Sequence, residues 1–165
     1  MNITIKPMQT PEEIEAKSVV HWQTWREAYD AILPTDFQEG MTLDRCRFYS
    51  QIYPDNTLIA LDGSKVIGFL SYGDFRDSKM QAGEIFALYV LKEYYGQGVG
   101  QRLMEAAFLL LADYQDILLW VLEDNKRAIA FYQKMGFCFD GQEKTIELGK
   151  LVREKRMVYR KRDVA

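Results

Sequence analysis

The chain has 165 residues, enough to bury the core of one domain but not of two, so we expect a single domain over residues 1–165. Its net charge of -3 argues against binding to nucleic acid, which needs a basic surface. No apolar run is long enough to span a membrane and no basic, apolar leader opens the chain, so a cytoplasmic protein without membrane contact is expected.

The cysteines and the histidine give no metal-binding pattern. Cys46 and Cys138 lie far apart, and the only histidine is His21. Because metal ligands come in closely spaced Cys/His groups, we expect no metal site. Both cysteines are expected to be buried free thiols. His21 is expected to be a surface or hydrogen-bonded residue rather than a catalytic base.

The N-terminal third is predicted to form one short strand followed by helices. Residues 3–6 favour the strand. Thr10 precedes a proline, and Glu13 follows three residues later, which is the pattern of a capping box at a helix start. The helical pattern of apolar residues continues as far as Pro34, and Thr42 is placed to cap another helix.

A hairpin and then a glycine-rich loop follow. Residues 57–61 and 65–72 flank Asp62-Gly63, a strong hairpin signal. The apolar, β-favouring segment 85–91 leads into a loop with the sequence Tyr94-Tyr95-Gly96-Gln97-Gly98-Val99-Gly100-Gln101. After the loop the apolar period becomes helical, with one face made of Val99, Leu103, Ala107, Leu110 and Leu111.

A strand, a glycine loop and a helix in this order present backbone N–H groups and the positive end of a helix to an anion. The loop therefore predicts a phosphate-bearing ligand near Gly98. Gly100 is not followed by Lys-Ser or Lys-Thr, so a nucleotide-hydrolysing loop is disfavoured. The glycine spacing G-x-G-x-G also differs from the G-x-G-x-x-G fingerprint of dinucleotide-binding proteins. Taken alone, the glycines are equally consistent with a simple turn between strand and helix.

A second strand and helix follow. Residues 117–122 form a continuous apolar run, typical of a strand covered on both faces. In the helix 126–135, Asn125, Ala128 and Tyr132 share one face, and Gly136 is placed to end the helix. Strand-like segments 144–148 and 151–159 come last. The sum is an α+β domain with flanking helices and a mixed, mostly antiparallel sheet of about seven strands, in which only the crossover from Val90 to Ile117 is parallel.

These motifs together resemble the Gcn5-related N-acetyltransferases (GNAT family). The resemblance covers roughly residues 85–137 and rests on three pieces: Leu88-Tyr89-Val90, the loop from Tyr95 to Gly100, and Asn125-x-x-Ala128-x-x-x-Tyr132-x-x-x-Gly136-Phe137. The loop corresponds to the family signature (Gln/Arg)-x-x-Gly-x-(Gly/Ala), from which this chain departs because Tyr95 stands at the first position.

The resemblance implies acetyl-CoA as the donor, a primary amine of a small molecule or peptide as the acceptor, and no metal. It places the following residues at the coenzyme: Leu88, Tyr89, Val90, Tyr95, Gly96, Gln97, Gly98, Val99, Gly100, Gln101, Asn125, Ala128 and Tyr132. A backbone amide of the strand with Leu88 and Val90 is expected to polarise the thioester carbonyl.

The side-chain roles leave alternatives open. Tyr132 is expected to be the general acid that protonates the departing thiolate. Two alternatives stay open: Tyr132 positions the sulfur without transferring a proton, or it is an aromatic residue of the core. Asn125 either bonds the pantetheine arm or caps its helix, and the two roles are compatible. Glu84 is a candidate general base acting through water, although a carboxylate at a strand start is often only solvated.

The acceptor is expected between the first helices and the strand end near Tyr72, with Trp25 and Tyr29 as further wall residues, although aromatics at helical spacing more often belong to the core. The acceptor amine, the preferred acyl chain and the formation of a homodimer stay open. Two other functions compete with the enzyme: a non-catalytic sensor of acyl-CoA, and a binder of another phosphate-bearing ligand.

Overall fold

The computed structural model describes residues 2–77 and 79–161, so both ends of the predicted 1–165 domain lie outside the described residues. The strands are β1 (Ile3–Pro7), β2 (Thr57–Asp62), β3 (Lys65–Asp74), β4 (Gly83–Val90), β5 (Asp116–Leu122), β6 (Cys138–Glu147) and β7 (Leu151–Arg160). The helices are α1 (Pro11–Tyr29), α2 (Thr35–Gly40), α3 (Leu43–Ile52), α4 (Val99–Leu110) and α5 (Lys126–Lys134), with a short 3-10 helix η1 (Lys92–Tyr94).

In the described part of the chain, the strands form one seven-stranded sheet in the order β1-β2-β3-β4-β5-β7-β6. All neighbours are antiparallel except β4 and β5, which are parallel. The predicted α+β class with a mixed, mostly antiparallel sheet is therefore confirmed, including the single parallel crossover. That crossover contains α4, as a parallel connection requires.

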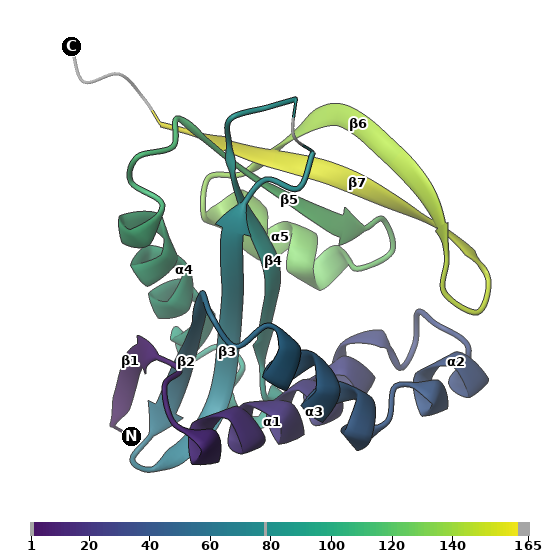
Figure 1. Ribbon diagram of the computed structural model, residues 1–165. Coiled ribbons are helices and arrows are strands. Elements are labelled where there is room, and N and C mark those ends of the chain that lie inside the picture. The colour runs from purple at the N-terminus through teal and green to yellow at the C-terminus, as the bar shows by residue number, and fades with distance from the viewer. Residues whose placement is uncertain (1, 78, 162–165) are drawn as a thin grey trace.

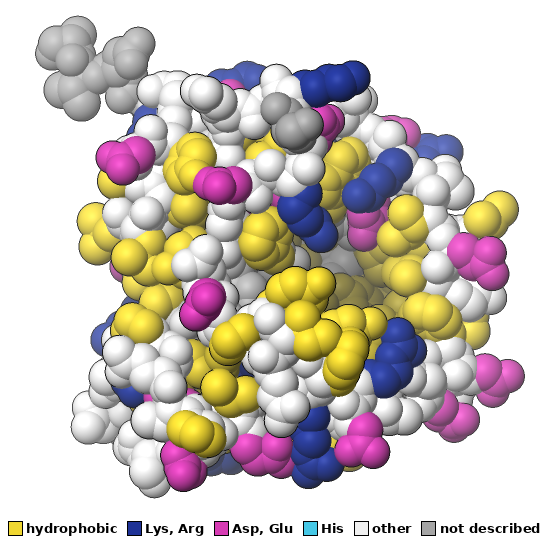
Figure 2. Space-filling model, in the orientation of Figure 1, with side chains coloured by type: hydrophobic (Ala, Val, Ile, Leu, Met, Phe, Trp, Pro, Cys, Tyr) yellow, Lys and Arg dark blue, Asp and Glu magenta, His cyan; other side chains and the backbone are white. Residues whose placement is uncertain are grey.

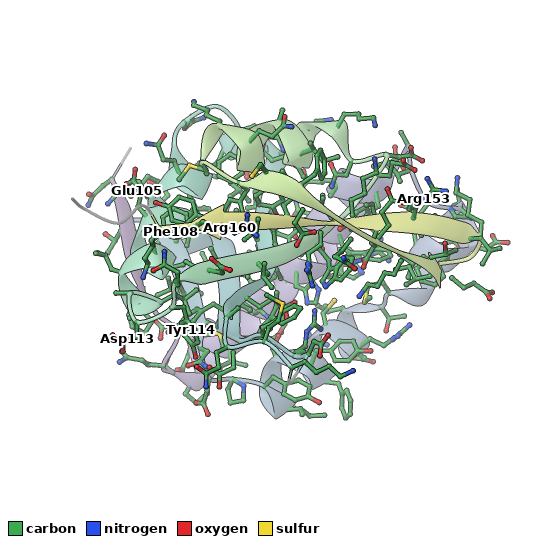
Figure 3. All side chains as sticks on the ribbon, turned by 90° about the horizontal axis from the view of Figure 1, so that it is seen from above. Glu105, Phe108, Asp113, Tyr114, Arg153 and Arg160 are labelled. Atoms are coloured by element: carbon green, nitrogen blue, oxygen red, sulfur yellow. The ribbon has the colours of Figure 1, made fainter. Side chains whose placement is uncertain are left out.

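The sheet separates two layers of helices. Helices α1, α2 and α3 lie on the near face in Figure 1, while α4 and α5 lie behind the sheet. In the view from above in Figure 3, α5 lies on one side of β5 and β7. Most of the core fills both sides of β3 and β4, where Ile67, Phe69 and Leu70 are almost completely buried.

The parallel strands β4 and β5 pair over a very short distance. The only registered partners are Gly83 with Ile117 and Glu84 with Leu118, although β4 continues to Val90 and β5 to Leu122. Figure 1 shows the two strands diverging beyond this point, with α5 behind the divergence. Residues 87–90 of β4 are accordingly half-buried, whereas residues 83–85 are buried. The sheet therefore opens at its centre.

Local signals explain the first helix, but its end differs from the prediction. The Thr10 hydroxyl accepts from the Glu13 N–H and the Glu13 carboxylate accepts from the Thr10 N–H, so the capping box is present. The helix ends at Tyr29 rather than near Pro34, and α2 was not predicted. The cause is the buried amide of Gln38, whose Nε2 donates to the carbonyls of Tyr29 (2.9 Å) and Leu33 (2.7 Å) and thereby satisfies the end of α1.

Three further expectations were wrong in detail. Leu110 is 52% exposed, because α4 ends there and the side chain of Leu111 packs beside Gly83 instead. Cys138 is exposed at the start of β6, so only Cys46 is a buried thiol. Strand β6 begins at Cys138 rather than near residue 144, because it pairs with β7 on both sides of an irregularity between Phe139 and Glu143.

Candidate active site

The glycine loop runs from the end of β4 through η1 to α4. Gly96 and Gly98 have φ of 76° and 79°, and Gly98 is the N-cap of α4 in a left-handed conformation. A Cβ at either position would meet no heavy atom within 4 Å. The positive φ, rather than crowding, is therefore the reason that glycine is needed at both positions.

The start of α4 carries backbone donors without partners in the helix. The first helical bond runs from the Arg102 N–H to the Gly98 carbonyl, at 3.1 Å. The N–H groups of Val99, Gly100 and Gln101 therefore have no acceptor in the helix. The first turn contains no acidic side chain. These amides and the positive end of the helix make the loop suited to a phosphate group.

The two helices behind the sheet meet beside this loop. A Cβ on Gly100 would lie 3.3 Å from Cζ of Phe131, so the small residue lets α5 pack closely against the first turn of α4. One turn earlier in α5, the guanidinium carbon of Arg127 lies 3.3 Å from the centre of the Tyr95 ring. Asn125 caps α5, with its Oδ1 accepting from the Ala128 N–H at 3.2 Å. The predicted capping role of Asn125 is confirmed.

The open edge of β4 offers a second set of backbone groups. On its other side β4 pairs with β3 as far as Val90, which faces Gly68. In an antiparallel pair, the backbone N–H and C=O groups of every second residue bond to the neighbouring strand. The backbone groups of the residues between them point to the opposite side of the strand. Beyond Glu84 that opposite side has no registered β5 partner. Amides of the segment Leu88-Tyr89-Val90 can therefore bond a ligand that lies in the divergence.

Tyr132 projects from α5 within an aromatic group. Its ring centre lies 5.6 Å from that of Phe131 and 6.0 Å from that of Phe137. Burial, with a smaller contribution from Tyr29, raises the pKa of Tyr132 above its ordinary value. The phenol is therefore protonated at neutral pH, as a general acid must be. The structure places it on the helix that lies behind the divergence of β4 and β5.

Glu84 is the last residue of β4 that pairs with β5, and it is only 1% exposed. Its Oε1 accepts from the backbone N–H and Nε of Arg76, both at 3.2 Å, and its Oε2 accepts from Nη2 of Arg76 at 2.5 Å. The Arg76 side chain is itself exposed and lies over the Phe86 ring. This ion pair was not predicted. A base role for Glu84 requires a water that reaches a carboxylate already bonded to a guanidinium.

The predicted acceptor residues lie in two places. Tyr29 packs against Trp25 (5.0 Å between ring centres), and its hydroxyl lies 3.1 Å from that of Tyr89. Trp25 is almost fully buried behind Tyr29, in a cluster with Leu33 and Leu122. Tyr72 instead packs on the main core beside the irregularity of the β3–β4 pairing. Only Trp25 and Tyr29 of the predicted wall are therefore brought together.

The sheet face next to this cluster carries charged residues that the sequence did not reveal. Two cations lie near the ring of Trp120 in β5. The Nζ atom of Lys144 is 4.2 Å from the ring centre, and the guanidinium carbon of Arg156 is 5.9 Å from it. Both cations have carboxylate partners, Glu154 at 3.5 Å and Asp140 at 2.6 Å respectively. Figure 2 shows this face hollowed between the helices below and the β6–β7 hairpin above, with hydrophobic side chains around the hollow.

His21 lies half-buried on α1, and Lys17 is buried one turn earlier. His21 packs against Phe69 and Tyr89, and its Nδ1 is buried without a hydrogen-bond partner among the described residues. Burial, with the nearby charge of Lys17, lowers the pKa of His21 to about 4. The expectation of a surface or hydrogen-bonded histidine therefore holds only in part, because the side chain is half-buried and its Nδ1 is unsatisfied among the described residues. Lys17 donates to the Ser50 hydroxyl at 3.0 Å, and burial lowers its pKa to about 8.

Comparison with known proteins now decides the family. The model described as "Acetyltransferase (GNAT) family" matches residues 22–137, well over half of the chain. The chain belongs to this family. It is therefore an acetyl-CoA-dependent N-acetyltransferase, as the sequence predicted.

Relatives agree in sequence and in fold. The uncharacterized N-acetyltransferase YuaI of Bacillus subtilis (strain 168) is 31% identical over 127 residues, which cover 74% of this chain and 73% of that protein. The N-alpha-acetyltransferase 30 of Schizosaccharomyces pombe is 29% identical over 110 residues, which cover 65% and 73%. The PaiA N-acetyltransferase of Thermoplasma acidophilum, solved with coenzyme A, has a TM-score of 0.77 at 20% identity and covers 98% of this chain and 100% of that one.

The described residues lack two features. They contain no helix long and apolar enough to cross a membrane. Over the same residues, no group of three or more His, Cys, Asp or Glu side chains is placed to hold a metal ion. Location in the cell and pairing with a second copy stay predictions.

Proposed function

We propose that this protein transfers the acetyl group of acetyl-CoA directly to a primary amine while both substrates are bound. One observation carries the proposal: β4 and β5 separate after Glu84 and Leu118, and each leads into a required part of the site. Strand β4 continues into the glycine loop, and β5 continues into the helix with Tyr132. A long, thin donor with phosphate at one end and a thioester at the other fits this arrangement.

The donor is held by backbone groups along its length. The diphosphate bonds to the amides of residues 97–101 at the start of α4. The pantetheine arm follows the open edge of β4, and an N–H of Leu88-Tyr89-Val90 donates to the thioester oxygen. One fixed donor of this kind lowers the barrier by about 3–4 kcal/mol, because negative charge develops on that oxygen.

The transfer needs two proton movements. The amine nitrogen attacks the carbonyl carbon, the carbon–sulfur bond breaks, and the sulfur leaves with the electron pair. The Tyr132 hydroxyl donates its proton to the sulfur and regains one from solvent. The amine loses its proton to a base, for which Glu84, acting through water, is the candidate. The products are the N-acetylated amine and free coenzyme A.

The acceptor approaches from the opposite face, between the α1–α2 segment and the β6–β7 hairpin. In this arrangement Tyr29 lies at one side of the acceptor. Trp120, with the ion-paired Lys144 beside it, lies on the sheet beneath the acceptor. Both small amines and peptides are candidate acceptors. One relative is by name an N-alpha-acetyltransferase, which favours including peptide α-amines among them.

A thiol-release assay over a panel of amines and peptides tests this function. We expect free thiol to appear only when acetyl-CoA and a suitable amine are both present. Binding of coenzyme A and of ADP, measured by calorimetry, separates the rival functions. Tight coenzyme binding without turnover on any amine would indicate a sensor, and equal affinity for ADP and coenzyme A would indicate another phosphate-bearing ligand.

A further inference from the structure

The contact between Tyr95 and Arg127 has no role in the function described so far. The Arg127 guanidinium carbon lies 3.3 Å from the centre of the Tyr95 ring, which is the separation of two stacked planes. Tyr95 belongs to the glycine loop, and Arg127 belongs to the first turn of α5. Two segments that are more than thirty residues apart in the sequence thus meet at the mouth of the loop.

Stacking leaves the hydrogen-bonding groups of the arginine free. The face of a guanidinium group lies against the aromatic ring, whereas its five N–H donors point outward in the plane of the group. No carboxylate lies within ion-pair distance of Arg127 among the residues that the structure describes, although twelve such pairs occur elsewhere. Arg127 is also exposed, so its donors can reach a ligand.

The surroundings of this guanidinium favour an anion. The glycine loop next to Arg127 leads into the amides of α4 that have no partner in the helix. The first turns of α4 and α5 both lack acidic side chains. The two helices are close together here, since Gly100 packs against Phe131. The positive end of α4 and a cation from the first turn of α5 therefore lie beside the same loop.

We propose that Arg127, held in place by the ring of Tyr95, binds the diphosphate of the coenzyme. This inference rests on the proposed function, because it needs the coenzyme in the glycine loop. Tyr95 can offer only a hydroxyl to a phosphate, but it fixes the direction of a side chain that offers two parallel N–H groups. The anchor cation of the loop thus comes from α5 rather than from the loop itself.

The test compares matched variants by calorimetry with coenzyme A and with dephospho-coenzyme A, which lacks the 3′-phosphate. Arg127→Gln should weaken binding of both ligands about 10- to 100-fold, as expected for loss of a charged hydrogen-bonding group. Lys126→Gln is the control, because Lys126 is exposed, adjacent and equally charged, but projects about 100° away around the helix. It should weaken binding less than about threefold, the size of a surface charge effect.

Variants of Tyr95 test the positioning role. Tyr95→Leu should weaken binding about 3- to 10-fold, the value of a cation–π contact, and Tyr95→Phe, which keeps the ring, should recover most of that loss. In a protein that already carries Arg127→Gln, Tyr95→Leu should weaken coenzyme binding little further, since the ring then has no cation to hold. Full additivity of the two losses would show that Tyr95 does not act through Arg127.

Each outcome separates this proposal from the proposed function. If Arg127→Gln and Lys126→Gln have equal effects while the wild type binds coenzyme A and acetylates an amine, only the role of Arg127 is wrong. If the loss occurs with coenzyme A but not with dephospho-coenzyme A, the guanidinium binds the 3′-phosphate and the assignment to the diphosphate is overturned. If the wild type does not bind coenzyme A, the proposed function fails as well.

Discussion

Replacing Tyr132 by phenylalanine removes one hydroxyl and leaves the ring in place against Phe131 and Phe137. Because the ring and its packing are kept, the free energy of unfolding should change by less than about 1 kcal/mol. Coenzyme affinity should also stay within about twofold, because in the proposed function the diphosphate and the arm are bound by groups other than the Tyr132 hydroxyl.

The turnover number should respond very differently. A positioned general acid contributes about 10²- to 10⁴-fold, equivalent to about 3–5 kcal/mol of barrier, so kcat should fall by that factor while coenzyme binding is maintained. Burial raises the pKa of Tyr132, so the wild-type acid stays protonated through neutral and mildly alkaline pH. Single-turnover thiol release measures the chemical step alone.

Tyr159→Phe is the matched control for this experiment. Tyr159 packs against the same Phe137 ring, at 5.8 Å, but belongs to β7. Its substitution removes the same hydroxyl and should leave kcat unchanged. If Tyr132→Phe keeps near-wild-type single-turnover rates, Tyr132 is not the acid. If both variants lose activity equally, the loss reflects the aromatic packing.

Four other substitutions test the loop, the ion pair and the histidine of α1. Gly98→Ala places a Cβ at a φ of 79° and should cost about 1–2 kcal/mol of stability and weaken acetyl-CoA binding; unchanged affinity by calorimetry would argue against the loop as the phosphate site. Glu84→Gln should lower kcat/KM and remove its acidic limb if Glu84 is the base, and a retained limb excludes that role. Arg76→Gln, which leaves the buried Glu84 carboxylate without its guanidinium, should destabilise the protein by about 1–3 kcal/mol in urea denaturation and serves as the comparison. The pKa of His21 is about 4 in the folded protein against an ordinary 6.5, so the folded state takes up the proton less readily than the unfolded chain. The contribution of His21 to the free energy of unfolding is therefore fully present above about pH 6.5. It is lost as the pH falls toward 4, and the total loss is about 3 kcal/mol. His21→Leu should flatten that part of the stability curve, and an equally steep curve would contradict the assignment.

Features that depend on a few neighbouring residues were predictable from the sequence. Thr10 with Glu13 marked the start of α1, and the change to a helical period after the glycine loop marked the start of α4, because both signals are local in the sequence. The parallel crossover also followed from local patterns, since two apolar strands were joined through a helix.

Features that depend on contacts between distant segments were not predictable. Gln38 ends α1 by reaching carbonyls five to nine positions earlier, and nothing in its sequence neighbourhood indicates this. Arg76 pairs with Glu84 only because the β3–β4 loop folds back on the strand. His21 looked like an ordinary helix residue, and its burial follows from the packing of α1 on Phe69. Periodicity assigns a face to a residue but does not say how deeply that face is covered.

The position of the site follows from how parallel strands are connected. Two adjacent parallel strands have their carboxyl ends at the same edge, so the turns after β4 and β5 must both lie there. Had the strands stayed paired to their ends, the space between those turns would be filled by strand backbone. Because pairing stops at Glu84 and Leu118, the two strands diverge toward that edge, where β4 leads into the glycine loop and β5 leads into the helix that contains Tyr132. Under the proposed function, we therefore expect a substitution that extends the β4–β5 pairing beyond Glu84 and Leu118 to weaken coenzyme binding, although it changes none of the residues assigned to bind the donor.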